Sequence, residues 1–119
     1  MQTIFVVDDS GMNLVVVKDA LKDNYRVMTL PSAAKMFSLI EKLKPDLILL
    51  DVFMPEMDGF EAIKLLKNNE QYANIPVIFL SSTIDDSIKE RGEKSGVVDF
   101  VLKPFEKAEL LEKIAKCLQ

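Results

Sequence analysis

An unbroken apolar run that ends in a single carboxylate constrains the fold of this chain more than any other feature. Residues 47–50 read LILL, and Asp51 follows directly. A strand that is apolar at every position, rather than at alternate ones, is typical of a parallel sheet covered by helices on both faces. Asp51 would then lie at the carboxyl edge of the sheet, where ligands bind in such folds. An Asp before a turn is also a common strand end, so Asp51 alone does not define a site.

The alternation of an apolar run with a helical pattern continues along the whole chain. Each predicted strand precedes a predicted helix, and the last helix covers residues 105–119. Four of the helical segments have apolar residues at helical spacing. The fourth, residues 85–95, is polar and charged and is expected to be only weakly anchored. The predicted strands cover residues 4–7, 25–30, 47–50, 76–80 and 98–102. Ser32 is expected to cap the second helix and Gly96 to end the fourth. The order predicts one α/β domain over residues 1–119, a doubly wound sandwich with no room for a second domain.

Composition limits the class of function. The chain has 119 residues, of which 49% are hydrophobic, and a formal net charge of -4, which argues against a basic face for nucleic acid. The single cysteine, Cys117, excludes an intramolecular disulfide and favours the reducing cytoplasm. The start of the chain shows neither a leader peptide nor a membrane-spanning run, so neither secretion nor membrane insertion is expected. Histidine is absent, which leaves carboxylates, hydroxyls and lysines to carry any chemistry.

Polar residues follow four of the five predicted strands. Asp8 and Asp9 follow the first strand, Asp51 the third, Ser81 the fourth and Lys103 the fifth. Because parallel strands end at the same edge of a sheet, these side chains should converge there. Each has a plain structural explanation by itself, as a helix cap, a turn residue or a solvated charge. Helix capping does not require this assortment, so the joint pattern favours a functional site.

The chemistry of these side chains points to phosphoryl transfer. Three close carboxylates cannot all stay ionised unless a cation lies between them. Oxygen ligands suit Mg²⁺, which typically takes one or two carboxylates together with phosphate oxygens. The Lys103 ammonium and the Ser81 hydroxyl can hold the outer oxygens of a phosphoryl group. Asp51, central in the sheet, is the candidate nucleophile that would become an aspartyl phosphate.

The motifs resemble the receiver domain of two-component response regulators. The matching segments are VVDDS at residues 6–10, LLDVFMPEMDGFE at 49–61, VIFLSS at 77–82 and DFVLKPF at 99–105, and they extend over the whole chain. The resemblance implies a flavodoxin-like (βα)5 fold, with a five-stranded parallel sheet in the order 2-1-3-4-5 and helices on both faces. Such a domain accepts a phosphoryl group and changes a protein-interaction face. It catalyses only its own phosphorylation and dephosphorylation, so it is not expected to be an enzyme for other substrates.

The resemblance also implies the metal site and the phosphoryl site. Asp51 would be the phosphoacceptor, and the acidic pair Asp8 and Asp9 would hold Mg²⁺ together with Asp51 and the backbone carbonyl of Phe53. Lys103 would contact the phosphoryl group, and its peptide bond to the following proline would be cis. An apolar side chain at Phe53 cannot orient the water that attacks the phosphoryl group, so self-dephosphorylation is expected to be slow.

The switch and the partners follow from the same resemblance. Phosphorylation would draw Ser81 toward the phosphoryl group, and Phe100, at the family's aromatic switch position, would fill the vacated space. Phe100 is equally compatible with a plain core position. The face made by the fourth helix, fifth strand and fifth helix would then change its preference for a downstream protein or output domain. The phosphodonor would be a histidine kinase or a phosphotransfer protein, and neither nucleic acid nor membrane is expected to bind directly.

Three alternatives compete with this interpretation. A phosphatase of the haloacid dehalogenase type also forms an aspartyl phosphate, but it needs a second acid two residues after the nucleophile, where this chain has Phe53. A nucleotide-binding domain needs a glycine-rich loop after the first strand, which is missing. Within the family, the sequence is equally compatible with a separate regulator and with a receiver from a hybrid kinase or a larger regulator.

Overall fold

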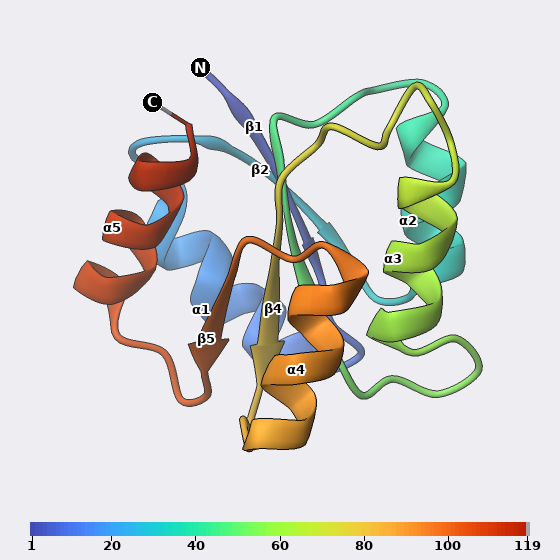
Figure 1. The fold of residues 1–119 in the computed structure, drawn as a ribbon. Helices are drawn as coiled ribbons and strands as arrows, with labels where there is room; N and C mark the ends of the chain where they lie inside the picture. The colour runs from blue at the N-terminus through green and yellow to red at the C-terminus, as the bar shows by residue number, and fades with distance from the viewer. Residues whose placement is uncertain (119) are drawn as a thin grey trace.

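Five strands alternate with five helices in the structure, a computed structural model that describes residues 1–118 (Figure 1). The strands are β1 (Thr3–Val7), β2 (Arg26–Leu30), β3 (Leu47–Asp51), β4 (Val77–Ser81) and β5 (Asp99–Leu102). The helices are α1 (Gly11–Leu21), α2 (Ala33–Ile40), α3 (Gly59–Lys67), α4 (Asp86–Ser95) and α5 (Lys107–Cys117). Every predicted strand is present, with ends that differ by at most one residue. The predicted last helix also included Gln119, which lies outside the described residues.

All five strands are parallel and form one sheet in the order β2-β1-β3-β4-β5, as expected. In the register of the sheet, Asp51 at the end of β3 pairs with Leu80 of β4. Ser81 at the end of β4 pairs with Leu102 of β5. The carboxyl ends of these strands therefore lie at one edge of the sheet.

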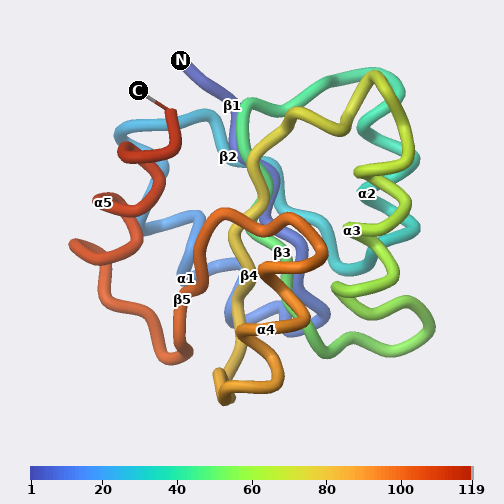
Figure 2. Tube along the Cα trace, in the orientation of Figure 1, coloured from blue at the N-terminus to red at the C-terminus, as the bar shows by residue number. Residues whose placement is uncertain are grey.

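Helices cover both faces of the sheet. The core on one face joins the sheet to α2, α3 and α4, and the core on the other face joins it to α1 and α5 (Figures 1 and 2). Every residue of β1, β3 and β4 is buried. This burial on both faces explains why the apolar runs of these strands do not alternate with polar residues.

The helix ends follow the expected capping chemistry. The Ser32 hydroxyl accepts a hydrogen bond from the Lys35 amide, and Gly96 ends α4 with a left-handed φ of 100°. The first helix is capped by Ser10 and not by the preceding acids, since the Ser10 hydroxyl accepts from the backbone amide of Asn13 at 3.3 Å. Asp8 and Asp9 are thus not used as the cap. Among the helices of residues 1–118, none combines the length and apolar character needed to cross a bilayer.

Candidate functional site

The ends of β1 and β3 bring three carboxylates together. One carboxylate oxygen from each of Asp8, Asp9 and Asp51 lies within 4.8 Å of the other two. Asp8 and Asp51 are buried, with 1% and 4% of their surfaces exposed, whereas Asp9 is exposed to solvent. The cluster therefore has a dry inner side, made by the strand ends, and an open side at Asp9.

Lys103 connects the two buried acids. Its Nζ lies 2.8 Å from Oδ2 of Asp8 and 3.1 Å from Oδ1 of Asp51. The lysine follows β5, where its backbone amide donates to the Ser81 carbonyl at 2.9 Å, and its peptide bond to Pro104 is cis, as expected. One ammonium faces three carboxylates, so the cluster keeps an excess of negative charge.

Burial and mutual repulsion change the protonation of this cluster. Burial, followed by the negative charge of Asp8, raises the pKa of Asp51 to about 7, although the hydrogen bond from Lys103 acts in the opposite direction. Burial by itself would lower the pKa of Lys103, but its hydrogen bonds and charge interactions with Asp8 and Asp51 outweigh burial and the pKa is raised. Lys103 therefore stays charged, and ionisation of Asp51 is disfavoured.

Two donors from the start of α1 hold Asp8 in place. The Ser10 amide donates to Oδ1 of Asp8 at 2.9 Å, and Nδ2 of Asn13 donates to Oδ2 at 3.2 Å. The sequence pattern does not single out Asn13, because an asparagine in a helical segment is usually a solvated residue. The one available signal was its position in the first turn of the helix that follows the acidic pair. A residue there lies close to the end of the preceding strand.

The loop after Asp51 returns closely to β3. A Cβ at Gly59 would lie 2.7 Å from the Asp51 carbonyl oxygen and 2.9 Å from Cα of Val52, so α3 can begin here only because residue 59 has no side chain. Asp58 caps the helix by accepting from the Glu61 amide at 2.9 Å. Within the loop, the Phe53 side chain is 57% exposed, so it does not cover the acid cluster as a packed wall.

Ser81 is buried at the same edge of the sheet, but its hydroxyl is engaged by its own loop. Oγ of Ser81 donates to the Thr83 carbonyl at 2.7 Å and accepts from the Thr83 amide at 3.1 Å. The structure thus unites Asp8, Asp9, Asp51 and Lys103 in one cluster, while Ser81 stands beside it on β4 with its hydroxyl turned to the β4-α4 loop.

Phe100 belongs to a row of rings beneath α4. Its ring contacts Phe79 edge-on at a centroid distance of 6.2 Å, and Phe79 contacts Phe60 in the same way at 5.3 Å. A Cβ at Gly92 of α4 would lie 2.7 Å from Cζ of Phe100. The ring is half-buried and lies between the sheet and α4.

The acid cluster fits a hard divalent cation. Its donors are carboxylate oxygens only, and three of them lie within 4.8 Å of one another. Burial, followed by the negative charge of Asp8, raises the pKa of Asp51, and a bound cation would offset both effects. Mg²⁺ prefers such oxygen ligands, whereas zinc sites in proteins usually include cysteine or histidine.

The family model of the response regulator receiver domain matches residues 4–115. The chain belongs to this family. Receiver domains are phosphoacceptor signalling domains of two-component systems, so the match confirms the function that the motifs predicted. The haloacid dehalogenase alternative finds no support among these matches.

Curated relatives of this receiver domain include regulators and kinases. It is 35% identical over its full length to the heme response regulator HssR of Staphylococcus aureus, of which it spans 52%. It is 28% identical over 97% of its length to the sensor histidine kinase TmoS of Ectopseudomonas mendocina, of which it spans 12%. The chain thus spans about half or less of the length of these relatives.

Solved structures confirm the receiver fold. The chemotaxis protein CheY4 of Vibrio cholerae superposes with a TM-score of 0.94 at 30% identity, and the match covers 99% of each chain. The receiver domain of the sensor histidine kinase PA1611 of Pseudomonas aeruginosa has a TM-score of 0.89 at 27% identity, covering 98% of this chain and 97% of that one. The PA1611 structure has a magnesium ion coordinated in its active site cleft.

Proposed function

We propose that residues 1–119 form one receiver domain in which Asp51 is the phosphoacceptor. The observation that carries this assignment is the ion-pair geometry at Asp51: a buried carboxylate at the end of β3, 3.1 Å from the Lys103 ammonium and next to the Asp8 carboxylate. The other two acids serve the cation. Asp8, Asp9 and Asp51, with the backbone carbonyl of Phe53, are the proposed Mg²⁺ ligands.

Phosphoryl transfer forms one bond and breaks one. A carboxylate oxygen of Asp51 attacks phosphorus, the bond from phosphorus to the donor breaks, and the donor's leaving atom keeps the electron pair. Mg²⁺, when bound, supplies positive charge for the phosphoryl oxygens and for the ionised acids. Lys103 already donates toward Asp51, so its ammonium is near enough to follow one outer oxygen of the new phosphoryl group. The Asp51 carboxylate must be ionised to attack, and cation binding favours that form.

The switch begins at Ser81. Its hydroxyl would exchange the Thr83 carbonyl for a phosphoryl oxygen, which would shift the loop between β4 and α4. Phe100, on the neighbouring strand, would follow. The ring contacts α4 at Gly92, and the Phe100 carbonyl accepts a hydrogen bond from Lys113 of α5. These contacts support α4, β5 and α5 as the face that changes.

The same proposal names the partners. A histidine kinase or phosphotransfer protein would donate the phosphoryl group, and a downstream protein or output domain would read the α4-β5-α5 face. With a net charge of -4, the domain is expected to act through proteins and to bind neither DNA nor membrane directly, and to catalyse only its own phosphorylation and dephosphorylation. We assign it to the cytoplasm, where the free, half-buried thiol of Cys117 would stay reduced.

Intact-mass spectrometry after incubation with acetyl phosphate tests the assignment. We expect one phosphoryl adduct on the wild type that requires Mg²⁺, no adduct on Asp51→Asn, and an unchanged adduct on the control Asp23→Asn, which alters an exposed acid away from the site. An adduct that persists in Asp51→Asn would contradict the proposal. Repeated turnover of acetyl phosphate without a stable adduct would instead favour a phosphatase.

A further inference from the structure

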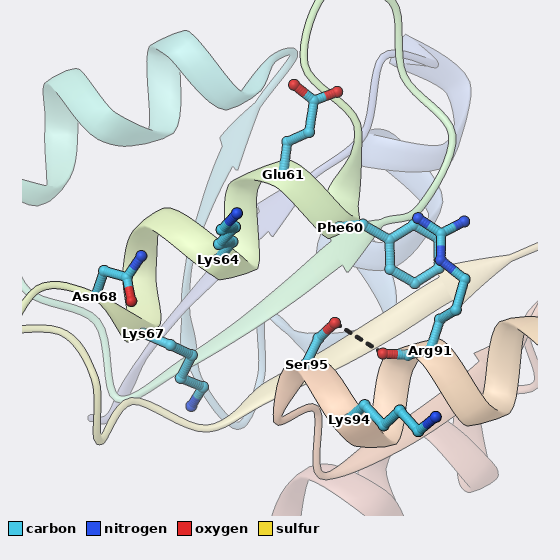
Figure 3. A pocket seen from close by; sticks show the side chains of 8 residues that line it. All are labelled: Phe60, Glu61, Lys64, Lys67, Asn68, Arg91, Lys94 and Ser95. Atoms are coloured by element: carbon cyan, nitrogen blue, oxygen red, sulfur yellow. Dashed lines mark hydrogen bonds between the residues drawn. The ribbon is translucent and has the colours of Figure 1, made fainter.

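A groove with a volume of about 560 Å³ runs between α3 and α4 (Figure 3). Its lining contains no member of the acid cluster, and α3 and α4 pack against each other along it. The lining residues are Phe60, Glu61, Lys64, Lys67, Asn68, Arg91, Lys94 and Ser95. The groove is therefore a feature separate from the phosphoryl site.

Cations form both walls of the groove. Lys64 and Lys67 lie on α3, and Arg91 and Lys94 lie on α4, so each helix presents two cations at an i, i+3 spacing. The one acidic lining residue is Glu61, whose carboxylate points away from Arg91 (Figure 3). A local excess of positive charge is unexpected in a chain with a net charge of -4.

Most of this charge is available to a ligand. Within residues 1–118, neither Lys64 nor Arg91 has a carboxylate at ion-pair distance. Lys94 pairs with Glu90 at 2.9 Å, but both side chains are largely exposed, and exposed pairs of this kind contribute little free energy. A partner's carboxylate can therefore replace Glu90 at small cost.

Two groove cations are held in place by the protein. The Arg91 guanidinium lies 3.8 Å from the centroid of the buried Phe60 ring (Figure 3), an arrangement that favours the cation over the ring face. Nζ of Lys67 donates to the Ala73 carbonyl at 3.0 Å, and its Cε lies 3.1 Å from where a Cβ at Gly96 would be. The side chains of Arg91 and Lys67 are therefore already ordered before a ligand binds, which lowers the entropy cost of binding.

The position of the groove decides which kind of anion it suits. Lysines near the last turn of a helix stabilise its dipole, and this accounts for Lys64, Lys67 and Lys94. It does not account for Arg91, which stacks on the Phe60 ring. A small phosphate usually binds at helix N-termini, where free backbone amides point at it. The groove reaches the N-terminus of α3 at Phe60 and Glu61, but there the Glu61 amide already donates to the Asp58 carboxylate and Glu61 adds a second negative charge. Two rows of cationic side chains, whose aliphatic stems line the groove, instead suit carboxylates spaced along a peptide with apolar residues between them.

We propose that the α3-α4 groove docks an acidic segment of a partner protein, in which Asp or Glu residues alternate with apolar residues. The carboxylates would lie between Lys64 and Arg91 and beside Lys94, and an apolar side chain would lie against the aliphatic stems of the lining lysines. This docking requires neither Mg²⁺ nor phosphorylation of Asp51. It adds a second protein-binding surface to the domain, on the side of α4 opposite β5.

An NMR titration of the unphosphorylated chain tests the proposal. The probe is a short capped peptide of alternating Glu and Leu, added at low ionic strength to ¹⁵N-labelled protein, with a Gln-Leu peptide as the neutral control. We expect saturable shift changes at the amides of residues 60–68 and 91–96, and none with the neutral peptide. Removing two cations in Lys64→Gln/Lys94→Gln should weaken binding about tenfold. The matched control Lys18→Gln/Lys116→Gln removes two exposed lysines of α1 and α5 and should bind like the wild type.

Three results would overturn the proposal. The first is no saturable shift change at these residues. The second is equal affinity in the two double variants, which would mean that binding reads overall charge and not the groove. The third is tighter binding of tripolyphosphate than of the peptide with the same lysine dependence, which would assign the groove to a small polyanion.

Discussion

The ring of Phe100 lies against Gly92, so β5 and α4 meet at the one residue of α4 that has no side chain. A Cβ at residue 92 would lie 2.7 Å from Cζ and 2.8 Å from Cε1 of the ring. A glycine inside a helix costs about 1 kcal/mol relative to alanine. Here the missing side chain allows α4 to approach Phe100, the proposed switch residue, closely.

Gly92→Ala should therefore lower the free energy of unfolding by about 1 kcal/mol, because overpacking outweighs the gain in helix propensity. Urea unfolding measures the change. In a Phe100→Leu background the smaller side chain leaves room for the new methyl group, and Gly92→Ala should then be neutral or stabilising. If the two substitutions are simply additive, residues 92 and 100 do not compete for the same space.

The raised pKa of Asp51 predicts how stability depends on pH in the absence of metal. The folded pKa is about 7, against 3.8 for an ordinary Asp, so the folded state binds a proton more tightly than the unfolded state. The tighter proton binding raises the free energy of unfolding by an amount on the order of 1–3 kcal/mol. This stabilisation is fully present below pH 4 and is lost as the pH rises through 7. Thermal unfolding in EDTA should therefore show the wild type losing stability from pH 5 to pH 8 relative to Asp51→Asn.

Two controls accompany the pH measurement. Asp23→Asn, at an exposed position, should show the same pH dependence as the wild type. Adding Mg²⁺ should raise the melting temperature more at pH 8 than at pH 5, because the cation binds the ionised acids. A wild type and an Asp51→Asn variant with parallel pH profiles would contradict a raised Asp51 pKa.

Asn13→Ala should weaken the metal site. The Asn13 amide donates to Oδ2 of Asp8 at 3.2 Å, and the loss of a partner that orients a ligand typically reduces metal affinity about tenfold or more. Titration with Mn²⁺, followed by electron paramagnetic resonance, measures the affinity directly. Asn24→Ala, which changes an exposed asparagine in the turn after α1, is the matched control. Equal affinities in the two variants would remove Asn13 from the site.

Phe53→Asn should shorten the lifetime of the phosphorylated domain. The Phe53 side chain is 57% exposed, and its ring offers no hydrogen bond to an attacking water, whereas an asparagine amide does. We expect the rate of phosphoryl loss in Mg²⁺ to rise about tenfold or more, since positioning a water is a modest part of general acid-base catalysis. Phe53→Leu is the control, and it should keep the slow rate. A fast wild type that Phe53→Asn leaves unchanged would contradict the role.

The strands were predictable because three of them are buried on both faces. The run that ends in Asp51 could be read as a parallel strand from apolar residues alone. The strand order could not, because local patterns do not say which strands are neighbours, and it required the family resemblance. The helix α1 shows the same limit: Met12 and Val15 are as apolar as Val17, yet they are 78% and 68% exposed while Val17 is fully buried.

The acid cluster was predictable because parallel strands end at a common edge, which brings Asp8 and Asp51 together from distant parts of the chain. The contacts that depend on side-chain direction were not. The Ser81 hydroxyl bonds to Thr83, and only the local turn decides this. Lys64 and Arg91 look like separate solvated charges in the sequence, and they become one groove because α3 and α4 pack side by side.

The row of rings from Phe60 through Phe79 to Phe100 also limits how this sequence can diverge. Phe79 is fully buried and touches both neighbours, so a change of volume at any one position leaves a void or an overlap that the next ring must absorb. Phe60 in turn holds Arg91 at the groove. Substitutions along this row should therefore accumulate in descendants of this protein as compensating pairs. A change at Phe100 would then be accompanied by changes at Phe60 and so at the groove.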